Sequence, residues 1–333
     1  MGDVAMTVPV VYSLAHQYPD LRISVLSRPF AKAFFSHMPK NVDFIAADLK
    51  NEYKGIKGLN QLYGRLKAKQ PTAIADFHDV LRSKYIRTRF TLCGYKTAHI
   101  DKHKNGKRKL CRQKDKVMEQ QPTSFQNYAE VLSKLGYPID LSFTSLFANG
   151  GNQLSQLSNI IGEKPDGERW IGIAPFAAHN GKMYPKEKME EVVKVLSTEY
   201  SNLRIFFFGG GKEEKQILNT WATKYKGCTC ASEVLQGLNE ELVLISHLDT
   251  MISMDSANMH LASLVGTRVV SIWGATHPYC GFLGWNQKED DAVQNTELEC
   301  RPCSVFGNKP CHRGDFECMH SIAPSAIIER LNL

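Results

Sequence analysis

The sequence predicts an α/β fold built from two similar units, each with a parallel sheet. Short apolar strands alternate with amphipathic helical stretches along the whole chain, and strands of the second half are followed by Gly, Asn or Asp. This alternation is typical of β–α–β crossovers, in which helices join parallel strands. With 333 residues, of which 43% are hydrophobic, the chain is long enough for two domains with cores of their own.

The first half is predicted to begin with a helix. Val8–Gln17 has a helical pattern, and Pro19 ends it. Three strands are then predicted, at Arg22–Leu26, Val42–Ile45 and Thr72–Asp76. An α/β domain ordinarily opens with a strand that leads into its first loop. Here the chain opens directly at Gly2, so we expect the first N-terminal strand to be missing from this sequence.

The second half repeats the pattern with longer apolar runs. Its predicted strands are Trp170–Ala174, Leu203–Phe208, Met251–Met254 and Arg268–Trp273. A helical pattern at Lys186–Ser197 follows the first of them. Loop-forming residues gather near residues 147–168. We therefore predict one domain at residues 1–155 and a second at residues 156–333.

Charge is distributed unevenly between the halves. Residues 1–150 hold 24 Lys and Arg against 12 Asp and Glu, whereas the remaining residues hold 17 against 22. The first half is therefore expected to face an anionic partner, for which nucleic acid, an anionic lipid surface and a phosphorylated glycolipid all qualify. No apolar run reaches the roughly 18 residues of a membrane span, and no secretory signal is visible, so we expect a soluble, cytoplasmic protein.

One stretch is unusually basic. Residues 102–116 carry eight basic side chains: Lys102, Lys104, Lys107, Arg108, Lys109, Arg112, Lys114 and Lys116. The stretch is either a solvated loop or an arm that grips an anionic acceptor or membrane headgroups. It contains no Phe, Tyr or Trp on which bases would stack, which argues against nucleic-acid binding.

The opening residues form the first candidate site. A Gly at a turn lets the backbone approach a ligand, and Asp3 next to Gly2 would lie at the carboxyl end of the sheet, where α/β proteins bind ligands. A simpler interpretation is that Asp3 or Thr7 caps the helix that follows.

Two Gly-containing loops follow strands of the second half. The first, residues 175–185, carries Gly181 and Lys182, and backbone N–H groups together with an ammonium suit a diphosphate. The second carries Gly209, Gly210 and Gly211 and then Glu213. Glu213 either hydrogen-bonds ribose hydroxyls or is favoured there by the helix dipole alone.

A fourth motif follows the strand MISM. Asp255 is predicted to be the N-cap of a helix that starts near Ser256, and His260 lies about one turn further on. A helix N-terminus at the edge of a sheet binds anions, and His260 would donate to a phosphate or a sugar. Single histidines are also common as structural residues, so the motif is informative mainly as a whole.

The C-terminal region contains four cysteines, Cys300, Cys303, Cys311 and Cys318. Four thiols suit a tetrahedral metal site, but the spacing of the second pair is wider than in a zinc knuckle. Free thiols are the simpler interpretation in a reducing compartment. We therefore assign no residue to a metal site at this stage.

Taken together and in their order, these motifs resemble glycosyltransferase family 9, which contains the ADP-heptose:lipopolysaccharide heptosyltransferases. The resemblance covers nearly the whole chain and is strongest from Ile171 to Trp285, where IGIAPFAAHNGKMYP, FFFGGGKEE and MDSANMHLASLVGTRVVSIWGATHP follow one another. The opening GDVAMTVPVVYSL also matches, and Asp76-Phe77-His78 matches less specifically.

The resemblance implies a GT-B architecture of two Rossmann-like domains, an N-terminal one for the acceptor and a C-terminal one for the nucleotide-sugar donor. It implies an inverting, metal-independent transfer of heptose from an ADP-sugar, without a cofactor, to a lipopolysaccharide core or lipid A-type glycolipid at the inner membrane surface. By this resemblance Asp3 is the general base. Lys182, Glu213, Asp255, Ser256 and His260 bind the donor.

For the acceptor, the basic stretch suggests Lys107, Arg108 and Lys109 as binding residues. The chain departs from many relatives at Tyr184, where they have Trp, and at Ala257, where they have Gly. We expect such changes to reshape the sugar pocket, which leaves UDP- and GDP-sugars as alternative donors. The competing hypothesis is a non-catalytic relative or a basic anion- or nucleic-acid-binding protein.

Overall fold

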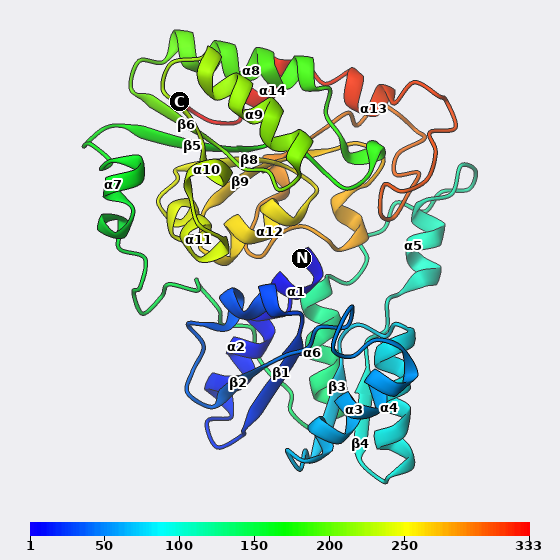
Figure 1. Cartoon of the computed structure of the whole chain (residues 1–333). Helices are drawn as coiled ribbons and strands as arrows, with labels where there is room; N and C mark the ends of the chain where they lie inside the picture. The colour runs from blue at the N-terminus through cyan, green and yellow to red at the C-terminus, as the bar shows by residue number, and fades with distance from the viewer. The chain divides into compact units, whose positions relative to one another are not determined.

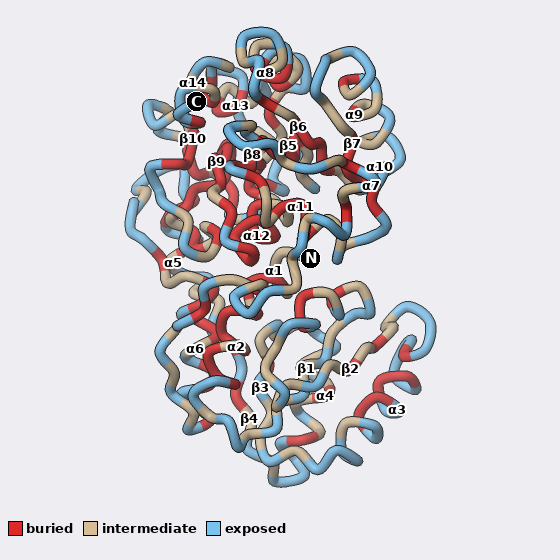
Figure 2. Tube along the Cα trace, turned by 90° about the vertical axis from the view of Figure 1, so that its left-hand side faces the viewer, coloured by how far each residue is buried: buried red, intermediate tan, exposed pale blue.

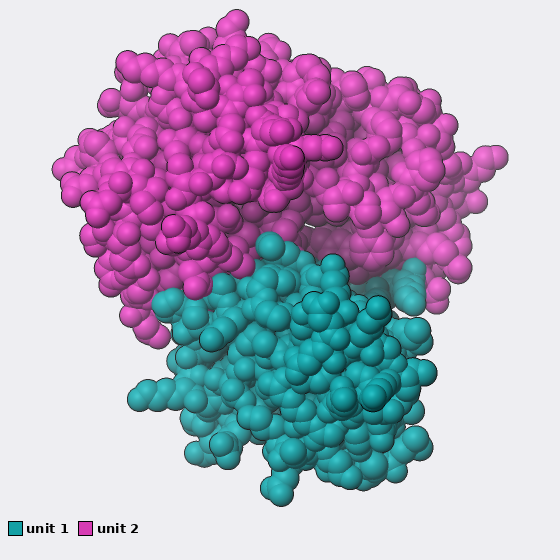
Figure 3. Space-filling model, viewed as in Figure 1, with its two compact units in different colours: residues 1, 3–104, 122–143 teal, residues 2, 105–121, 144–333 magenta.

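The computed structural model describes all 333 residues (Figure 1). The chain forms two compact units, shown in different colours in Figure 3. The first unit comprises Met1 and residues 3–104 and 122–143, and the second comprises Gly2 and residues 105–121 and 144–333. Most of the basic stretch and residues 144–155 thus pack with the second unit, whereas the sequence suggested a single boundary after residue 155.

The second unit is built on one parallel sheet of six strands in the order β10-β9-β8-β5-β6-β7. The strands are β5 (Arg169–Ala174), β6 (Leu203–Phe207), β7 (Cys228–Cys230), β8 (Thr250–Met254), β9 (Arg268–Trp273) and β10 (Ala292–Gln294). Successive strands proceed from β5 toward β7 on one side and from β8 toward β10 on the other. The chain therefore reverses direction across the sheet between β5 and β8, which makes this the topological switch point.

The second unit also contains helices. They are α5 (Lys104–Leu110, which begins in the first unit), α7 (Ser158–Ile161), α8 (Lys186–Glu199), α9 (Lys212–Lys224), α10 (Ala231–Val234), α11 (Leu238–Ser246), α12 (Ala257–Leu264), α13 (Glu317–His320) and α14 (Pro324–Glu329). Short 3₁₀ turns lie at Leu154–Gln156, Asn180–Lys182, Pro278–Cys280 and Glu289–Asp291.

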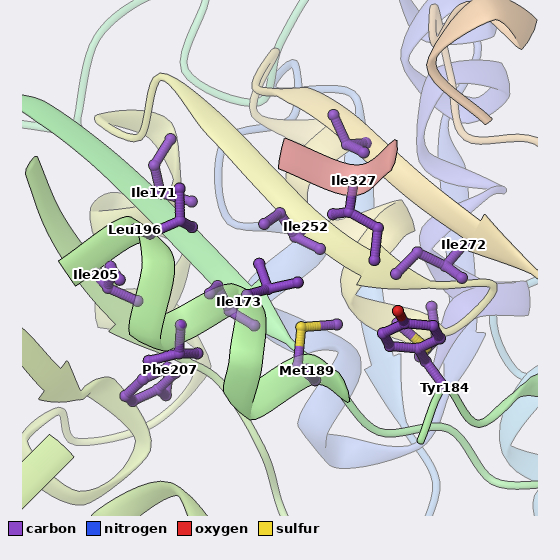
Figure 4. Close-up of a cluster of buried hydrophobic side chains, with 14 of the residues drawn as sticks. Ile171, Ile173, Tyr184, Met189, Leu196, Ile205, Phe207, Ile252, Ile272 and Ile327 are labelled. Atoms are coloured by element: carbon purple, nitrogen blue, oxygen red, sulfur yellow. The ribbon is translucent and has the colours of Figure 1, made fainter. Parts of the chain in front are cut away.

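The core of the second unit follows directly from its sequence pattern. α8 buries Met189, Val192, Val193 and Leu196, which are spaced at three, four and seven residues and therefore share one helix face. This face packs against strand side chains such as Ile173, as Figure 4 shows. All five residues of β8 are buried, as expected of a strand covered on both faces (Figure 2).

The first unit contains two separate parallel sheets of two strands each. β1 (Ile23–Ser27) pairs with β2 (Val42–Ala46), and β3 (Ala73–Asp76) pairs with β4 (Lys96–His99). The helices are α1 (Gly2–Ala5), α2 (Val8–Gln17), α3 (Gly55–Lys67), α4 (Leu81–Leu92) and α6 (Ser124–Lys134), with a 3₁₀ turn at Pro29–Phe35. α1 is the first element, and no strand joins β1 to β3.

None of the helices combines the length and the apolar character that crossing a membrane requires.

An ion-pair network fixes the end of β3 to α4 in the first unit. Arg87 Nη1 lies 2.8 Å from Asp76 Oδ2 and 2.9 Å from Asp79 Oδ1, and the Asp76 side chain is only 5% exposed. Asp76 Oδ1 also accepts hydrogen bonds from the backbone N–H groups of His78 and Asp79. The Asp76-Phe77-His78 motif therefore has a structural explanation, because its carboxylate orders the turn that leads into α4.

We expect Arg87→Ala to lower the free energy of unfolding by about 3 kcal/mol, since it leaves a buried carboxylate without its partner. Urea unfolding measures the change. Lys69→Ala is the matched control, because its ion pair with Asp43 is about half exposed on both sides and should contribute less than about 1 kcal/mol. Equal losses in the two variants would contradict a special role for Arg87.

Candidate active site

The site lies in the second unit at the carboxyl ends of β5 and β8. These strands pair directly and in parallel, with Ile173 opposite Ile252 and Ala174 opposite Ser253. The loops that follow them therefore begin side by side at the switch point. In open α/β sheets this is where ligands bind, since the loops diverge there and leave room above the strands.

A buried ion pair joins the two loops. Lys182, at the end of the turn after β5, places its Nζ 2.8 Å from Oδ2 of Asp255, the first residue after β8. The side chains are 15% and 3% exposed. The contact is an ion pair without the angle of a hydrogen bond. Burying an ammonium or a carboxylate is costly unless an opposite charge lies next to it. The Lys182 and Asp255 side chains therefore fix each other's position at the switch point.

Glycines allow three loops to close around Lys182. Gly307 has φ +72°, and a Cβ atom there would lie 2.6 Å from Lys182 Cγ. A Cβ atom on Gly181 would lie 2.7 Å from the carbonyl oxygen of Gly307. The carbonyl of Gly181 accepts a 2.8 Å hydrogen bond from the backbone N–H of Ala275, which follows β9. The Lys182 stem is thus confined by backbone, which leaves its ammonium little freedom.

α12 starts beside this pair, but its N-cap differs from the prediction. Ser256, not Asp255, is the N-cap, with an extended backbone at φ −144°. The capping assignment for Asp255 is wrong because its carboxylate faces Lys182 instead. Ser256 Oγ lies 3.3 Å from Ser253 Oγ, and His260 lies within α12 with 6% of its surface exposed. Lys182, Asp255, Ser256 and His260 are therefore brought to the same edge of the sheet.

Glu213 lies at the start of α9, after β6, the strand on the other side of β5. The neighbouring Glu214 accepts the backbone N–H groups of Gly210 and Gly211, at 2.8 and 3.2 Å. Glu214 thus satisfies the donors at this helix start, while Glu213 is exposed. The sequence left open whether Glu213 is present only because an acidic residue stabilises a helix N-terminus. Glu214 makes the hydrogen bonds at this N-terminus, so the exposed Glu213 carboxylate is available for a ligand.

Asp3 belongs to the first unit, within the short helix α1. Its side chain is exposed, and its backbone carbonyl accepts a 3.4 Å hydrogen bond from the Tyr128 hydroxyl. Burial, and then the Asp3 carboxylate, raise the pKa of Tyr128. Thr7 Oγ1 donates to the carbonyl of Val4 and makes no capping bond to α2. Helix capping therefore does not explain the side chain of Asp3 or that of Thr7.

The three basic residues predicted for the acceptor differ in their surroundings. Arg108 and Lys109 are exposed on α5. Lys107 is 6% exposed, and its Nζ lies 4.3 Å from the ring centroid of Phe282. Lys107 therefore packs within the second unit through a cation–π contact, and it is not displayed to solvent as the basic pattern suggested.

Tyr184 does not line the site. It is 2% exposed within the cluster of buried side chains drawn in Figure 4, and its hydroxyl donates to the carbonyl of Ile322 at 3.0 Å. The expectation that this departure reshapes the sugar pocket is therefore wrong. Position 184 is a core position, at which Tyr finds a polar partner for its hydroxyl.

His277 is a further candidate residue near this edge of the sheet, which the sequence reasoning missed. It follows β9, the neighbour of β8, and is 8% exposed. Burial, and then the charges of Arg301 and Lys116, lower the pKa of His277 to about 4, so the ring is neutral at pH 7. Its Nδ1 accepts the backbone N–H of Tyr279 at 3.0 Å, which leaves the proton on Nε2. The available signal was a His four residues after a buried strand, with Gly274 between them.

These features define an α/β protein with a candidate ligand site at the switch point of its six-stranded sheet, and comparison with known proteins identifies its family. Residues 60–310 match glycosyltransferase family 9 (heptosyltransferase), so the chain belongs to this family and is a glycosyltransferase. It is similar to lipooligosaccharide heptosyltransferase 2 of Campylobacter jejuni, with 24% identity over 99% of this chain and 94% of the relative.

Solved structures confirm the predicted fold class. ADP-heptose lps heptosyltransferase II of E. coli superposes with a TM-score of 0.69 at 17% identity, over 98% of this chain and 93% of that one. A family 9 glycosyltransferase of Veillonella parvula gives a TM-score of 0.72 at 17% identity, over 100% of this chain and 93% of that one. The α/β fold is therefore the GT-B fold of heptosyltransferases.

We expect Tyr184→Phe to lower the free energy of unfolding by about 1 kcal/mol, because the buried carbonyl of Ile322 loses a hydrogen-bond donor. Thermal or urea unfolding measures this change. A variant of unchanged stability would show that the hydroxyl contributes nothing at this position.

Proposed function

We propose that this chain is an inverting heptosyltransferase. It transfers heptose from ADP-heptose to an anionic glycolipid of the lipopolysaccharide core or lipid A type. Family membership and the similarity to lipooligosaccharide heptosyltransferase 2 support this substrate class. The observation that carries the proposal is the Lys182–Asp255 ion pair at the switch point, because it presents a confined cation where a nucleotide diphosphate would lie.

Lys182 stabilises the leaving diphosphate. An ammonium has three N–H donors, so Lys182 can face Asp255 and still donate to phosphate oxygens. The N-terminus of α12 adds backbone N–H groups and a positive helix end at the same edge. As the bond from the sugar to the diphosphate breaks, the growing negative charge meets groups that are already in place. This arrangement supports a transfer without a catalytic metal.

The remaining donor contacts follow from the positions of the strands. Ser256 and His260 lie at the start of α12 and would contact phosphate or sugar oxygens. Glu213, exposed after β6, would accept hydrogen bonds from ribose hydroxyls. Together with Lys182 and Asp255, these residues are proposed to bind the donor.

Asp3 is the proposed general base. Its exposed carboxylate would take the proton of the acceptor hydroxyl as that oxygen attacks the anomeric carbon. The new bond forms on the face opposite the departing diphosphate, so the configuration at this carbon is inverted. Arg108 and Lys109 supply positive charge for a phosphorylated acceptor, and such charges also favour the anionic inner surface of the cytoplasmic membrane.

Transfer assays with a panel of donors test the whole proposal. We expect turnover with ADP-heptose that does not rise when Mg²⁺ or Mn²⁺ is added. Turnover only with a UDP- or GDP-sugar would keep the enzyme class and change the donor. Binding of a nucleotide without transfer to any glycolipid would favour a non-catalytic relative.

We expect Lys182→Ala to weaken ADP binding roughly 30-fold, the loss of one charged hydrogen bond of about 2 kcal/mol. Isothermal titration calorimetry measures this affinity. Tyr184→Phe is the control, because it should lose stability and keep its affinity for ADP. If both variants lose affinity together, the effect of Lys182→Ala comes from destabilisation and not from a lost contact.

We expect Asp3→Asn to slow transfer by at least roughly 100-fold, since the amide cannot accept the proton. ADP affinity should remain that of the unaltered protein. The readout is single-turnover transfer at saturating donor. Near-normal turnover would remove Asp3 from the mechanism.

The double variant Arg108→Ala/Lys109→Ala should weaken use of a phosphorylated acceptor by roughly 30-fold at low salt, at about 1 kcal/mol for each charge. Acceptor KM measures the effect, and ADP affinity should not change. Lys186→Ala removes a charge of similar exposure from α8 and should have no effect on acceptor KM. An equal change in the control would indicate a general electrostatic effect.

A further inference from the structure

The short helix that carries Asp3 depends on the rest of the first unit for its position. α1 is four residues long, and a single helical turn is unstable in isolation because too few hydrogen bonds offset the ordering of its backbone. The direction of the Asp3 carboxylate is therefore set by the contacts that α1 makes with its surroundings. Because the Asp3 side chain is exposed, contacts to its backbone are the ones that fix it.

The backbone hydrogen bonds of α1 leave the carbonyl of Asp3 without a donor. The N–H groups of Val4 and Ala5 both donate to the carbonyl of Met1, and the N–H of Thr7 donates to that of Val4. Thr7 Oγ1 also donates to Val4, at 2.7 Å. None of these bonds ends on the carbonyl of Asp3, which is one of the acceptors that the end of a helix leaves unsatisfied.

Tyr128 of α6 supplies the donor for this carbonyl. Its hydroxyl lies 3.4 Å from the Asp3 carbonyl oxygen, and hydrogen bonds of active sites are often this long before a substrate binds. Tyr128 is 5% exposed, and a buried hydroxyl without a partner is costly. The contact therefore satisfies both groups and joins α6 to the turn that carries Asp3.

The Tyr128 ring is itself held in place. It stands on α6, whose first turn is closed by reciprocal hydrogen bonds between Thr123 and Gln126. The centroid of the ring lies 4.9 Å from that of Phe77, which directly follows β3. Through Tyr128, the backbone of Asp3 is thus connected to a capped helix and to the end of a strand.

The Tyr128 hydroxyl remains protonated near neutral pH. Burial, and then the Asp3 carboxylate, raise the pKa of Tyr128 above the usual value of a phenol. The hydroxyl therefore acts as a hydrogen-bond donor and does not compete with Asp3 for a proton.

We propose that Tyr128 is a positioning residue for Asp3, an inference that rests on the proposed function of Asp3 as the general base. By donating to the Asp3 carbonyl, the hydroxyl fixes the turn that carries the carboxylate and so the direction from which the carboxylate meets the acceptor hydroxyl. A general base must lie within hydrogen-bond reach of the proton that it takes. Displacement of a reacting group by about 1 Å can cost roughly 100-fold in rate.

Single-turnover transfer by Tyr128→Phe is the first test. The variant keeps the ring that contacts Phe77 and removes only the hydroxyl. We expect the chemical step to slow roughly 10-fold, part of the roughly 100-fold effect of removing the base, with acceptor KM and ADP affinity unchanged. Tyr18→Phe is the matched control, because the Tyr18 hydroxyl also donates to a backbone carbonyl of the first unit, that of Pro138 at 2.8 Å. A normal rate in Tyr128→Phe, or an equal loss in the control, would overturn the proposal.

A double variant separates this inference from the function on which it rests. If Tyr128 acts through Asp3, adding Tyr128→Phe to Asp3→Asn should slow transfer no further, whereas independent effects multiply. A multiplied loss would therefore refute the positioning role. If Asp3→Asn alone is slow and Tyr128→Phe is normal, the inference fails and the proposed base stands. Near-normal turnover of Asp3→Asn would overturn the proposed base, and the inference with it.

Discussion

The organisation of the site depends on one buried ion pair, between Lys182 and Asp255. Lys182 follows β5 and Asp255 follows β8, the two adjacent strands between which the strand order reverses. The pair therefore links the β5-β6-β7 side of the sheet to the β8-β9-β10 side. A lysine this buried persists only beside a carboxylate. The backbone N–H of Asp255 donates to the carbonyl of Ile272 in β9, which fixes the backbone that carries this carboxylate. The electrostatics of the site are thus fixed by the sheet itself.

Close packing of backbone makes this arrangement rigid. Gly181, Gly274 and Gly307 bring three loops together at distances that leave no room for a Cβ atom. Arg301, in the segment after β10, donates to the carbonyls of Trp273, Gly274 and Thr276 and so joins this segment to the end of β9 and the loop that follows it. The segment between β10 and α13, residues 295–316, is therefore part of the support of the site, although it lies far along the chain from Lys182.

Much of the fold could be predicted from the sequence because the second unit has long, continuous apolar strands. The predicted helix Val8–Gln17 and strand Arg268–Trp273 have the observed bounds, and Trp170–Ala174 differs by one residue. The strands β4, β7 and β10 were missed. β7 and β10 are three-residue edge strands, and β4 reads KTAH, which has no apolar run. Such strands form because a neighbouring strand offers backbone partners, a signal that is absent from local sequence.

The candidate site was predictable in part for similar reasons. The residues after buried strands, such as Asp255 and Lys182, could be assigned to one edge because parallel strands end together. Their pairing could not, since it depends on the strand order β8-β5. The burial of Lys107 and Tyr184 was equally hidden, because each depends on a partner distant in sequence, Phe282 and Ile322.

The interleaving of the two units has a consequence for how the chain is made and re-engineered. Between residues 3 and 333 the chain passes from one unit to the other after residues 104, 121 and 143. During synthesis, residues 105–121 emerge long before their partners Tyr279, Phe282 and Pro302, so this segment must wait for the region after β9 before it reaches its final place. A chimaera that exchanges the second unit for that of a relative must therefore carry the 105–121 segment with it, and a single junction near residue 150 would join mismatched partners.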